Sequence, residues 1–283
     1  MKIIILIFLL FLSIKSVSVS KMNFESLIKK SHPFAYALDL KLIPSKQANA
    51  PVTICCHGYG HSNKIAEVVH SFRVIPDHLL GFNFPDYGII PSFDHNKTTF
   101  GSIDEILPLL FVLKLCVIDA GQDIINLYGF SAGGGAIINA LALLNRSQYA
   151  EKLTKIGITD NYKKKIIAAV EKGLIILDCP LKSMEEIIDL RGKDLMLEIM
   201  SECYKKNDMR PIDAIDGLLG LKLNIILHFQ DPDDILSNRD DTLFSNKLTT
   251  VNKGNTCVVI GKDGGHNTFH ASLWKEYKKW CEL

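Results

Sequence analysis

The sequence has almost no net charge and no long run of charges of one sign. Its 283 residues include 32 Lys and Arg against 31 Asp and Glu, for a formal net charge of +1 at pH 7. Nucleic-acid-binding domains usually cluster an excess of basic residues, so the composition gives no support for a nucleic-acid partner. Internal repeats and low-complexity tracts are also missing. With 47% hydrophobic residues, the chain can form one large α/β domain with a substantial core.

Signatures for cofactors and metals are missing as well. The three glycines at 133–135 do not match G-x-G-x-x-G, and no segment reads G-x-x-x-x-G-K followed by Ser or Thr. The sequence therefore implies no organic cofactor and no metal. The cysteines show no metal-ligand spacing, and their odd number and scattered placement argue against a disulfide framework. They are Cys55, Cys56, Cys116, Cys179, Cys203, Cys257 and Cys281.

The N-terminal apolar run is too short to cross a membrane as a helix. Residues 3–14 are apolar except for Ser13, and ~20 residues are needed to span a bilayer. A basic start, a short apolar core and small residues after it are typical of a secretory signal peptide. We expect residues 1–20 to be a signal peptide cleaved near Ser18 or Ser20, or an uncleaved N-terminal anchor that attaches the protein to a membrane through residues 3–14. The protein is then exported (secreted or periplasmic) or membrane-anchored, with residues 21–283 as its single domain.

Short apolar runs alternate with helical patterns along the rest of the chain. Several runs are continuously apolar, as in strands buried on both faces of a parallel sheet. The alternation predicts an α/β fold with a doubly wound, mainly parallel sheet flanked by helices. The longest interruption, residues 180–222, is interpreted either as a small helical lid or as ordinary crossover helices. Strands are predicted at 36–42, 52–56, 79–84, 124–128, 174–178, 224–229 and 256–260, and helices at 63–72, 103–120, 134–144, 162–172, 195–206 and 269–280.

Residues 129–133 read Gly-Phe-Ser-Ala-Gly and join an apolar, β-branched run to a helix pattern of small and apolar residues. This is G-x-S-x-G in the strand–turn–helix context that gives the motif its meaning. Gly129 and Gly133 are expected because a very tight turn brings backbone segments too close for a Cβ. Ser131 would then expose its hydroxyl at the tip of the turn.

A serine hydroxyl is a weak nucleophile, so it needs a base within reach and a third group that orients the base. Two later predicted strands end in loops that supply both. The strand at 224–229 leads into the acid-rich segment 230–234, and the strand at 256–260 leads to Gly264-Gly265-His266-Asn267. The chain order Ser, Asp, His, each on a loop after its own strand, is the order that goes with G-x-S-x-G in this type of fold.

These three segments, together with His57-Gly58-Tyr59-Gly60 after the strand at 52–56, resemble the α/β-hydrolase superfamily over roughly residues 36–283. The resemblance implies that Ser131 is the nucleophile, that His266 is the general base and later the acid, and that an Asp of the 230–234 loop orients the imidazole. An oxyanion needs two backbone donors. Ala132, the residue after the nucleophile, supplies one, and by resemblance Tyr59 supplies the other.

Three acids compete for the role of orienting His266. In the family the acid commonly stands three residues before an aliphatic residue, and Asp233 fits because Leu236 follows it at that distance. Asp231 lies closer to the end of the strand, and Asp234 is the third candidate. His270 is interpreted as a surface or packing residue.

The sequence therefore predicts an exported, esterase- or lipase-like serine hydrolase that cleaves carboxylic esters with small or medium acyl chains through an acyl-enzyme. Its partner would be a small-molecule ester or other acyl substrate. A thioesterase, a short-peptide peptidase and an acyltransferase would use the same residues, because all pass through the same tetrahedral intermediate. A binding protein of the same fold with an inactive triad is the alternative outside catalysis.

Overall fold

The structure is a computed structural model that describes residues 38–47, 49–72, 74–85, 103–192, 195–262, 264–268 and 270–281. The predicted signal peptide or anchor at residues 1–20 lies outside these ranges. Among the helices of the described ranges, none is both long and apolar enough to cross a bilayer.

In the described ranges, seven strands form one sheet in the order β1-β3-β2-β4-β5-β6-β7. Only β1 runs antiparallel to its neighbour β3; the other strand pairs are parallel. The predicted doubly wound, mainly parallel sheet is thereby confirmed. The strands are β1 (Lys41–Ile43), β2 (Val52–Cys56), β3 (His78–Gly81), β4 (Ile125–Phe130), β5 (Leu174–Asp178), β6 (Asn224–Gln230) and β7 (Asn255–Gly261).

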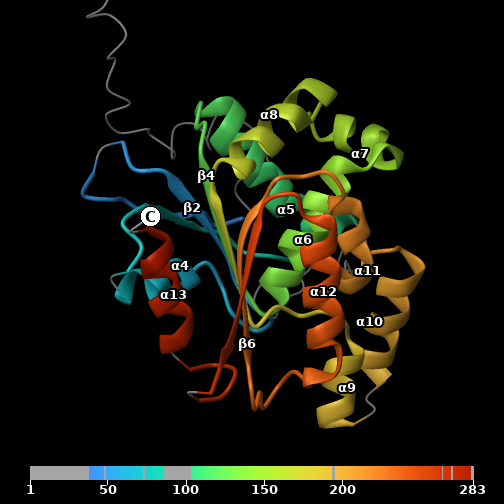
Figure 1. Cartoon of the computed structure of the whole chain (residues 1–283). Helices are drawn as coiled ribbons and strands as arrows, with labels where there is room; N and C mark the ends of the chain where they lie inside the picture. Colours follow the sequence, from blue (N-terminus) through green and yellow to red (C-terminus); the bar gives the residue numbers. More distant parts are fainter. Residues whose placement is uncertain are drawn as a thin grey trace, which may run out of the picture.

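Helices cover both faces of the sheet (Figure 1). Two helices, α4 and α13, lie on one face, and α5, α6, α8 and α12 lie on the other. The helices are α4 (Ile65–Ser71), α5 (Ile103–Lys114) with a π-helical turn at Leu115–Asp119, α6 (Ala132–Asn145), α7 (Ala150–Lys155), α8 (Asp160–Glu171), α9 (Glu185–Arg191), α10 (Leu195–Lys206), α11 (Pro211–Ala214), α12 (Asp241–Val251) and α13 (Ala271–Cys281). Short 3₁₀ turns occur at Ser147–Tyr149, Ile215–Leu218 and Asn238–Asp240.

The two cores explain why the central strands are continuously apolar. In β6, Ile225 and Leu227 pack into the larger core with α6 and α12, whereas Ile226 between them packs with Trp274 of α13. Successive strand residues point to opposite faces, so a strand that is covered on both faces needs an apolar residue at every position.

Two predicted strands are shorter than expected, each for a local reason. The strand predicted at 36–42 is β1, Lys41–Ile43; residues 36 and 37 lie outside the described ranges, and Asp39 takes a φ of 44°, which interrupts extended backbone. The strand predicted at 79–84 ends at Gly81, since the chain turns so that the Phe84 N–H reaches the Nε2 of His57.

Helix α12 was missed by the sequence analysis. It reads DTLFSNKLTTV, and its Thr, Ser and Asn have weak helix propensity. Only Phe244 and Leu248 are buried, so the apolar stripe is one turn long. Packing against β7 and the turn before β6 compensates for the weak local preference.

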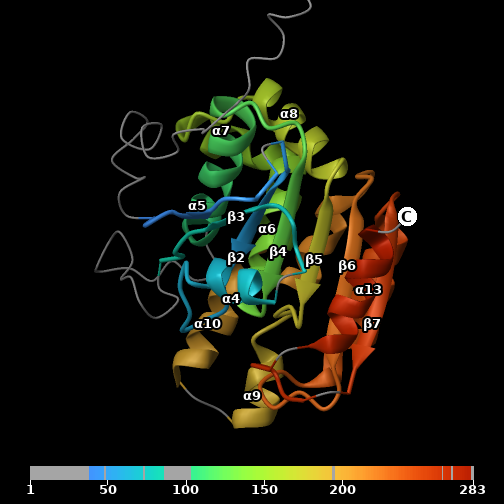
Figure 2. The same cartoon turned by 90° about the vertical axis from the view of Figure 1, so that its left-hand side faces the viewer.

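The segment 180–222 connects β5 to β6 and contains α9, α10 and α11. Figure 2 shows α9 and α10 beyond the end of the sheet, where β4 and β5 finish. A buried ion-pair network anchors α9. Lys182 Nζ lies 2.7 Å from Glu186 Oε2 of α9 and 2.7 Å from Asp241 Oδ1 of α12. Burial alone would lower the pKa of Lys182, but Glu186 and Asp241 raise it above its usual value, so the ammonium stays charged.

Replacing Lys182 alone is expected to lower the free energy of unfolding more than replacing Lys182 and Glu186 together. Burial raises the pKa of Glu186 to about 8, with Lys182 opposing the rise. Lys182→Met therefore leaves the Glu186 carboxyl buried either as an uncompensated charge or with a bound proton, and the loss of the pair lowers the free energy of unfolding by about 3 kcal/mol. Lys182→Met/Glu186→Gln should recover a large part of that loss in urea unfolding at neutral pH. Lys279→Met, which breaks an exposed pair with Glu276, is the control and should cost less than about 1 kcal/mol. A Lys182→Met protein as stable as the wild type contradicts this account.

Candidate active site

Ser131 lies in the sharp turn between β4 and α6, with φ 52° and ψ −121°. A positive φ is uncommon for a residue with a side chain. Such strain persists only where the surroundings enforce it, and it gathers at functional sites. The turn therefore has the strand–turn–helix geometry that the sequence predicted.

Two glycines allow this turn. A Cβ on Gly133 would lie 2.3 Å from the carbonyl oxygen of Cys56 in β2, and a Cβ on Gly129 would lie 2.7 Å from the Cα of Gly134. Both distances are shorter than real Cβ contacts. The prediction that close backbone approach requires these glycines is confirmed.

His266 and Asp233 form a buried pair beside this turn. The Nδ1 of His266 lies 2.7 Å from Oδ2 of Asp233, and the side chains are 2% and 7% exposed. The other oxygen of Asp233 accepts the backbone N–H groups of Ile235 and Leu236 at 2.7 and 2.8 Å. The predicted aliphatic residue after the acid, Leu236, is buried and belongs to the core.

The other two candidate acids do not meet the imidazole. Asp234 accepts the backbone N–H of His266 at 2.7 Å, so it holds the loop rather than the ring. Asp231 is exposed, and its backbone N–H donates to the carbonyl of Gly261 at the end of β7. Of the three acids, Asp233 alone is hydrogen-bonded to the His266 ring in the described ranges.

In the Asp233–His266 pair, Nδ1 of the imidazole faces the carboxylate and Nε2 is left without a hydrogen-bond partner in the described ranges. Burial alone would raise the pKa of Asp233, but the hydrogen bond from His266 and the two backbone N–H groups hold it below its usual value. A carboxylate facing Nδ1 places the proton of a neutral imidazole on Nδ1. Within the described ranges, the Nε2 of His266 is buried and has no hydrogen-bond partner. It is therefore available to accept a proton.

The loop after β2, residues 57–60, packs directly against the turn. A Cβ on Gly58 would lie 3.1 Å from the Cβ of Ser131. Ala132 is the first residue of α6, where a backbone N–H has no acceptor within the helix. The loop and the start of α6 thus both lie beside Ser131, where the sequence led us to expect the backbone donors of Tyr59 and Ala132.

His57 braces this loop. Its Nδ1 donates to the carbonyl of Gly58 at 2.8 Å, and its Nε2 accepts the backbone N–H of Phe84 at 3.0 Å. The ring is 1% exposed, and burial lowers its pKa to about 4. His57 is therefore a neutral structural link at neutral pH.

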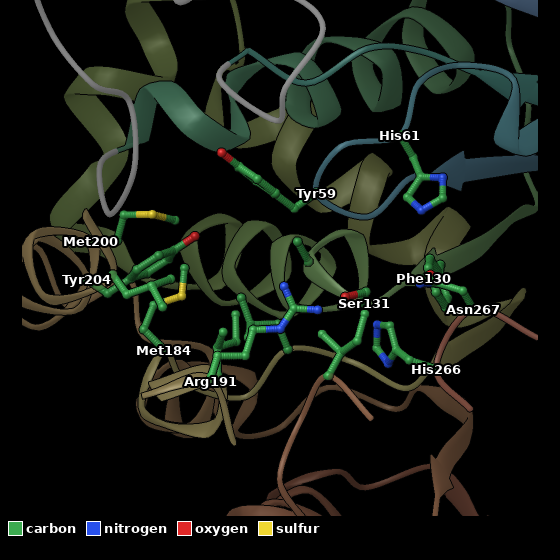
Figure 3. Close-up of a pocket in the computed structure, with 15 residues that line it drawn as sticks. Tyr59, His61, Phe130, Ser131, Met184, Arg191, Met200, Tyr204, His266 and Asn267 are labelled. Carbon is green, nitrogen blue, oxygen red and sulfur yellow. The ribbon is translucent and has the colours of Figure 1, made fainter. Parts of the chain in front are cut away.

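A cavity of about 290 Å³ opens beside Ser131 and His266 (Figure 3). Its walls are mainly apolar, and α9 and α10 supply one side of it. Tyr204 of α10 is fixed there because its hydroxyl donates to the buried carboxylate of Glu105 in α5. The lining residues are Tyr59, His61, Phe130, Ser131, Ala132, Leu181, Met184, Ile187, Arg191, Leu197, Met200, Tyr204, Ile235, His266 and Asn267. The segment 180–222 thus walls the cavity, and its interpretation as a lid stays a prediction.

No protein-family model matches the chain, and no curated protein matches it. Solved structures do match. A lipase/esterase from Lactobacillus plantarum gives a TM-score of 0.59 at 12% identity, over 86% of this chain and 90% of that one. Est1E from Butyrivibrio proteoclasticus, with bound ferulic acid, gives 0.58 at 15% identity over 87% and 94%. An acylaminoacyl peptidase from Pyrococcus horikoshii gives 0.55 at 18% identity over 87% of this chain and 38% of the peptidase.

The chain has the α/β-hydrolase fold. The similarity spans most of the chain and includes the sheet, so the fold expected from the sequence is confirmed. At this level of identity the matches show the architecture and leave the reaction to the residues of the site.

Beneath the site of this hydrolase fold lies a buried polar network that the sequence analysis missed. Oδ1 of Asp178, the last residue of β5, lies 3.0 Å from Nδ1 of His228 and 2.7 Å from Nδ1 of His270. Its Oδ2 accepts the hydroxyl of Tyr128 at 2.8 Å. His270 was interpreted as a surface or packing residue; the surface option is wrong, since the ring is 1% exposed and packs on His228 with centroids 4.6 Å apart. Its Nε2 lies 3.2 Å from the carbonyl of Gly265. Polar residues within the apolar strand runs LIILD and NIILHFQ were the signal for this network.

Asp178, Cys179, His228 and His270 form one of two clusters in the described ranges whose possible metal-ligand atoms lie within 4.8 Å of one another; the other is Cys179, Asp233 and His266. The two imidazole nitrogens, however, lie at hydrogen-bond distance from the Asp178 carboxylate, so protons occupy the space that an ion would need. Burial raises the pKa of the Cys179 thiol far above its usual value. Cys179 is therefore neither a ready metal ligand nor a nucleophile that competes with Ser131.

The pKa of His57 predicts acid sensitivity. Folded His57 binds a proton near pH 4, whereas the unfolded residue binds one near 6.5. Its contribution to stability is therefore complete above pH 6.5 and is lost as the pH falls to 4, by about 3 kcal/mol. Urea unfolding across this range should show that His57→Gln loses less stability than the wild type. His70→Gln, which changes an exposed histidine of α4, is the control. Equal losses in wild type and His57→Gln would show that His57 is not the group responsible.

Proposed function

We propose that this chain is a serine hydrolase that cleaves carboxylic esters with Ser131, His266 and Asp233. The observation that carries the proposal is the open Nε2 of His266, buried in the cavity that Ser131 also lines. The ring of Phe130, the residue before Ser131, packs on the imidazole with centroids 4.9 Å apart, and Figure 3 shows His266 beside Ser131. A base with a free nitrogen next to a strained serine matches the needs of nucleophilic catalysis.

In the first half of the reaction, the oxygen of Ser131 attacks the carbonyl carbon of the ester. Nε2 of His266 accepts the hydroxyl proton, and the carbonyl electron pair moves onto oxygen. The imidazolium is stabilised by the carboxylate of Asp233 through Nδ1. When the intermediate collapses, the C–O bond to the alcohol breaks, the alcohol oxygen takes the proton from Nε2, and an acyl-serine remains.

In the second half, water takes the place of the alcohol. Nε2 of His266 accepts a proton from water as its oxygen attacks the acyl carbon, and the carboxylic acid leaves when Ser131 regains its proton. In both halves the oxyanion would receive hydrogen bonds from the backbone N–H groups of Ala132 and Tyr59. The start of α6 adds the positive end of the helix dipole at that point.

Esters are the first substrates to test. The lipase/esterase from L. plantarum and Est1E share this fold, and an apolar cavity suits an acyl or aryl group better than a peptide backbone, whose polar groups need partners. Thioester and amide analogues belong in the same panel because they form the same tetrahedral intermediate. An inert protein of this fold would cleave none of them.

A fluorophosphonate reagent is expected to label the wild-type protein once per chain. Ser131→Ala should abolish labelling and lower ester hydrolysis on the order of 10⁴-fold or more. The control is Ser147→Ala, which changes an exposed serine beyond the C-terminal end of α6 and should leave labelling normal. A wild-type protein that does not label, or a Ser131→Ala protein that labels fully, rejects the serine-hydrolase proposal.

The assignment of the acid makes a separate prediction. Asp233→Asn keeps a hydrogen-bond acceptor near His266 but removes the charge that stabilises the imidazolium, so kcat should fall about 10⁴-fold. Asp234→Asn still accepts the His266 backbone N–H and is the matched control, with Asp231→Asn as a second. We expect both to stay within about tenfold of the wild type, since neither loses a charge at the ring. Steady-state kinetics that show an active Asp233→Asn enzyme would reject the choice of acid.

A further inference from the structure

Arg191 lines the cavity beside Ser131 without a carboxylate partner. It is the last residue of α9, and Figure 3 shows its guanidinium directed toward Ser131. No acidic residue lines the cavity in the described ranges. The proposed reaction uses neither this cation nor any charge at this place.

The other arginines in the described part of the chain are ion-paired. Arg146 pairs with Asp208 at 2.7 Å, and Arg239 pairs with Asp189 at 3.1 Å. Arg210 pairs with Asp213 at 3.1 Å. In the same ranges, no carboxylate forms an ion pair with Arg191. The difference is therefore specific to the arginine that faces the cavity.

The acidic residues of α9 all form ion pairs with cations other than Arg191. Glu185 pairs with Arg210 and Lys205, Glu186 with Lys182, and Asp189 with Arg239. A basic residue at a helix C-terminus is favourable on its own. That effect accounts for a cation at position 191, but not for a guanidinium that turns into an apolar cavity.

We infer that Arg191 is a specificity residue that binds an anionic oxygen group, a carboxylate or phosphate, on the ester that enters this cavity. The inference rests on the proposed ester hydrolysis and names its substrate class. An anion in an apolar cavity is costly unless a cation pairs with it. The planar guanidinium fork binds both anions through two hydrogen bonds. The neutral remainder of the substrate lies against the apolar wall that includes Met184 and Met200.

The test compares matched esters that differ in one charge. On the acyl side, mono-p-nitrophenyl adipate is compared with p-nitrophenyl hexanoate. On the alcohol side, hexanoyl esters of p-hydroxybenzoate and of p-hydroxyphenyl phosphate are compared with that of p-cresol. The wild type should prefer the charged member of at least one pair by about tenfold in kcat/KM, the value of one charge-assisted hydrogen bond at a partly exposed site. The preference should shrink as salt is added. The pair that shows it identifies the anion and the side of the ester.

The variants assign the preference to one side chain. Arg191→Gln should abolish the preference, and Arg191→Lys should keep part of it because the charge remains without the fork. Arg239→Gln removes a surface arginine outside the cavity and should leave the preference unchanged. A wild type without preference in any pair, or a preference that survives in Arg191→Gln, overturns the inference. If none of the esters is hydrolysed and the fluorophosphonate reagent does not label the protein, the hydrolase proposal itself is rejected.

Discussion

The backbone hydrogen bonds of Ser131 are the constraint on which the site depends. Its N–H donates to the carbonyl of Asp178 at 2.9 Å, and its carbonyl accepts the N–H of Leu181 at 2.9 Å. Both partners belong to the end of β5 and the segment that leaves it. A positive φ at a non-glycine residue costs roughly 1–3 kcal/mol, and these two bonds hold the turn against that cost. Leu181 is the second residue of the crossover segment 180–222 that walls the cavity, so the turn and the wall share one backbone anchor.

Asp178 extends the same constraint to the candidate base. Its carbonyl holds Ser131, while its carboxylate holds His270, whose Nε2 reaches the carbonyl of Gly265 next to His266. Burial alone would raise the pKa of Asp178, but hydrogen bonds from His228 and His270 keep it far below its usual value, so the carboxylate stays charged. The proposed nucleophile and the proposed base come from distant parts of the chain, and a single buried residue ties both loops to the same strand end. Rigid support of this kind is what a precise catalytic geometry needs.

The sequence predicts the parts of this arrangement that leave a local pattern. Continuous apolar strands, the glycines around Ser131 and the aliphatic residue after Asp233 each reflect a contact that only certain residue types permit. The parts it does not predict depend on contacts between distant residues. Asp39 delays the start of β1 through its backbone conformation, α12 forms through packing despite weak helix propensity, and His270 is buried because its ring is hydrogen-bonded to Asp178. A pattern within one segment can mark a polar residue as unusual, but it does not show which distant residue will meet it.

The proposed chemistry and the inferred specificity therefore come from different parts of the chain. The strand ends supply Ser131, Asp233 and His266, whose arrangement follows from the sheet order and would serve any acyl substrate. One wall of the cavity comes from α9 and α10, and in the described ranges the acids of α9 pair with cations other than Arg191, which lines the cavity. A connecting segment can change in sequence without disturbing the sheet. We therefore expect substrate preference to depend on the crossover segment rather than on the G-x-S-x-G motif. The fold alone therefore leaves the substrate open, and the inferred role of Arg191 is what would assign its class.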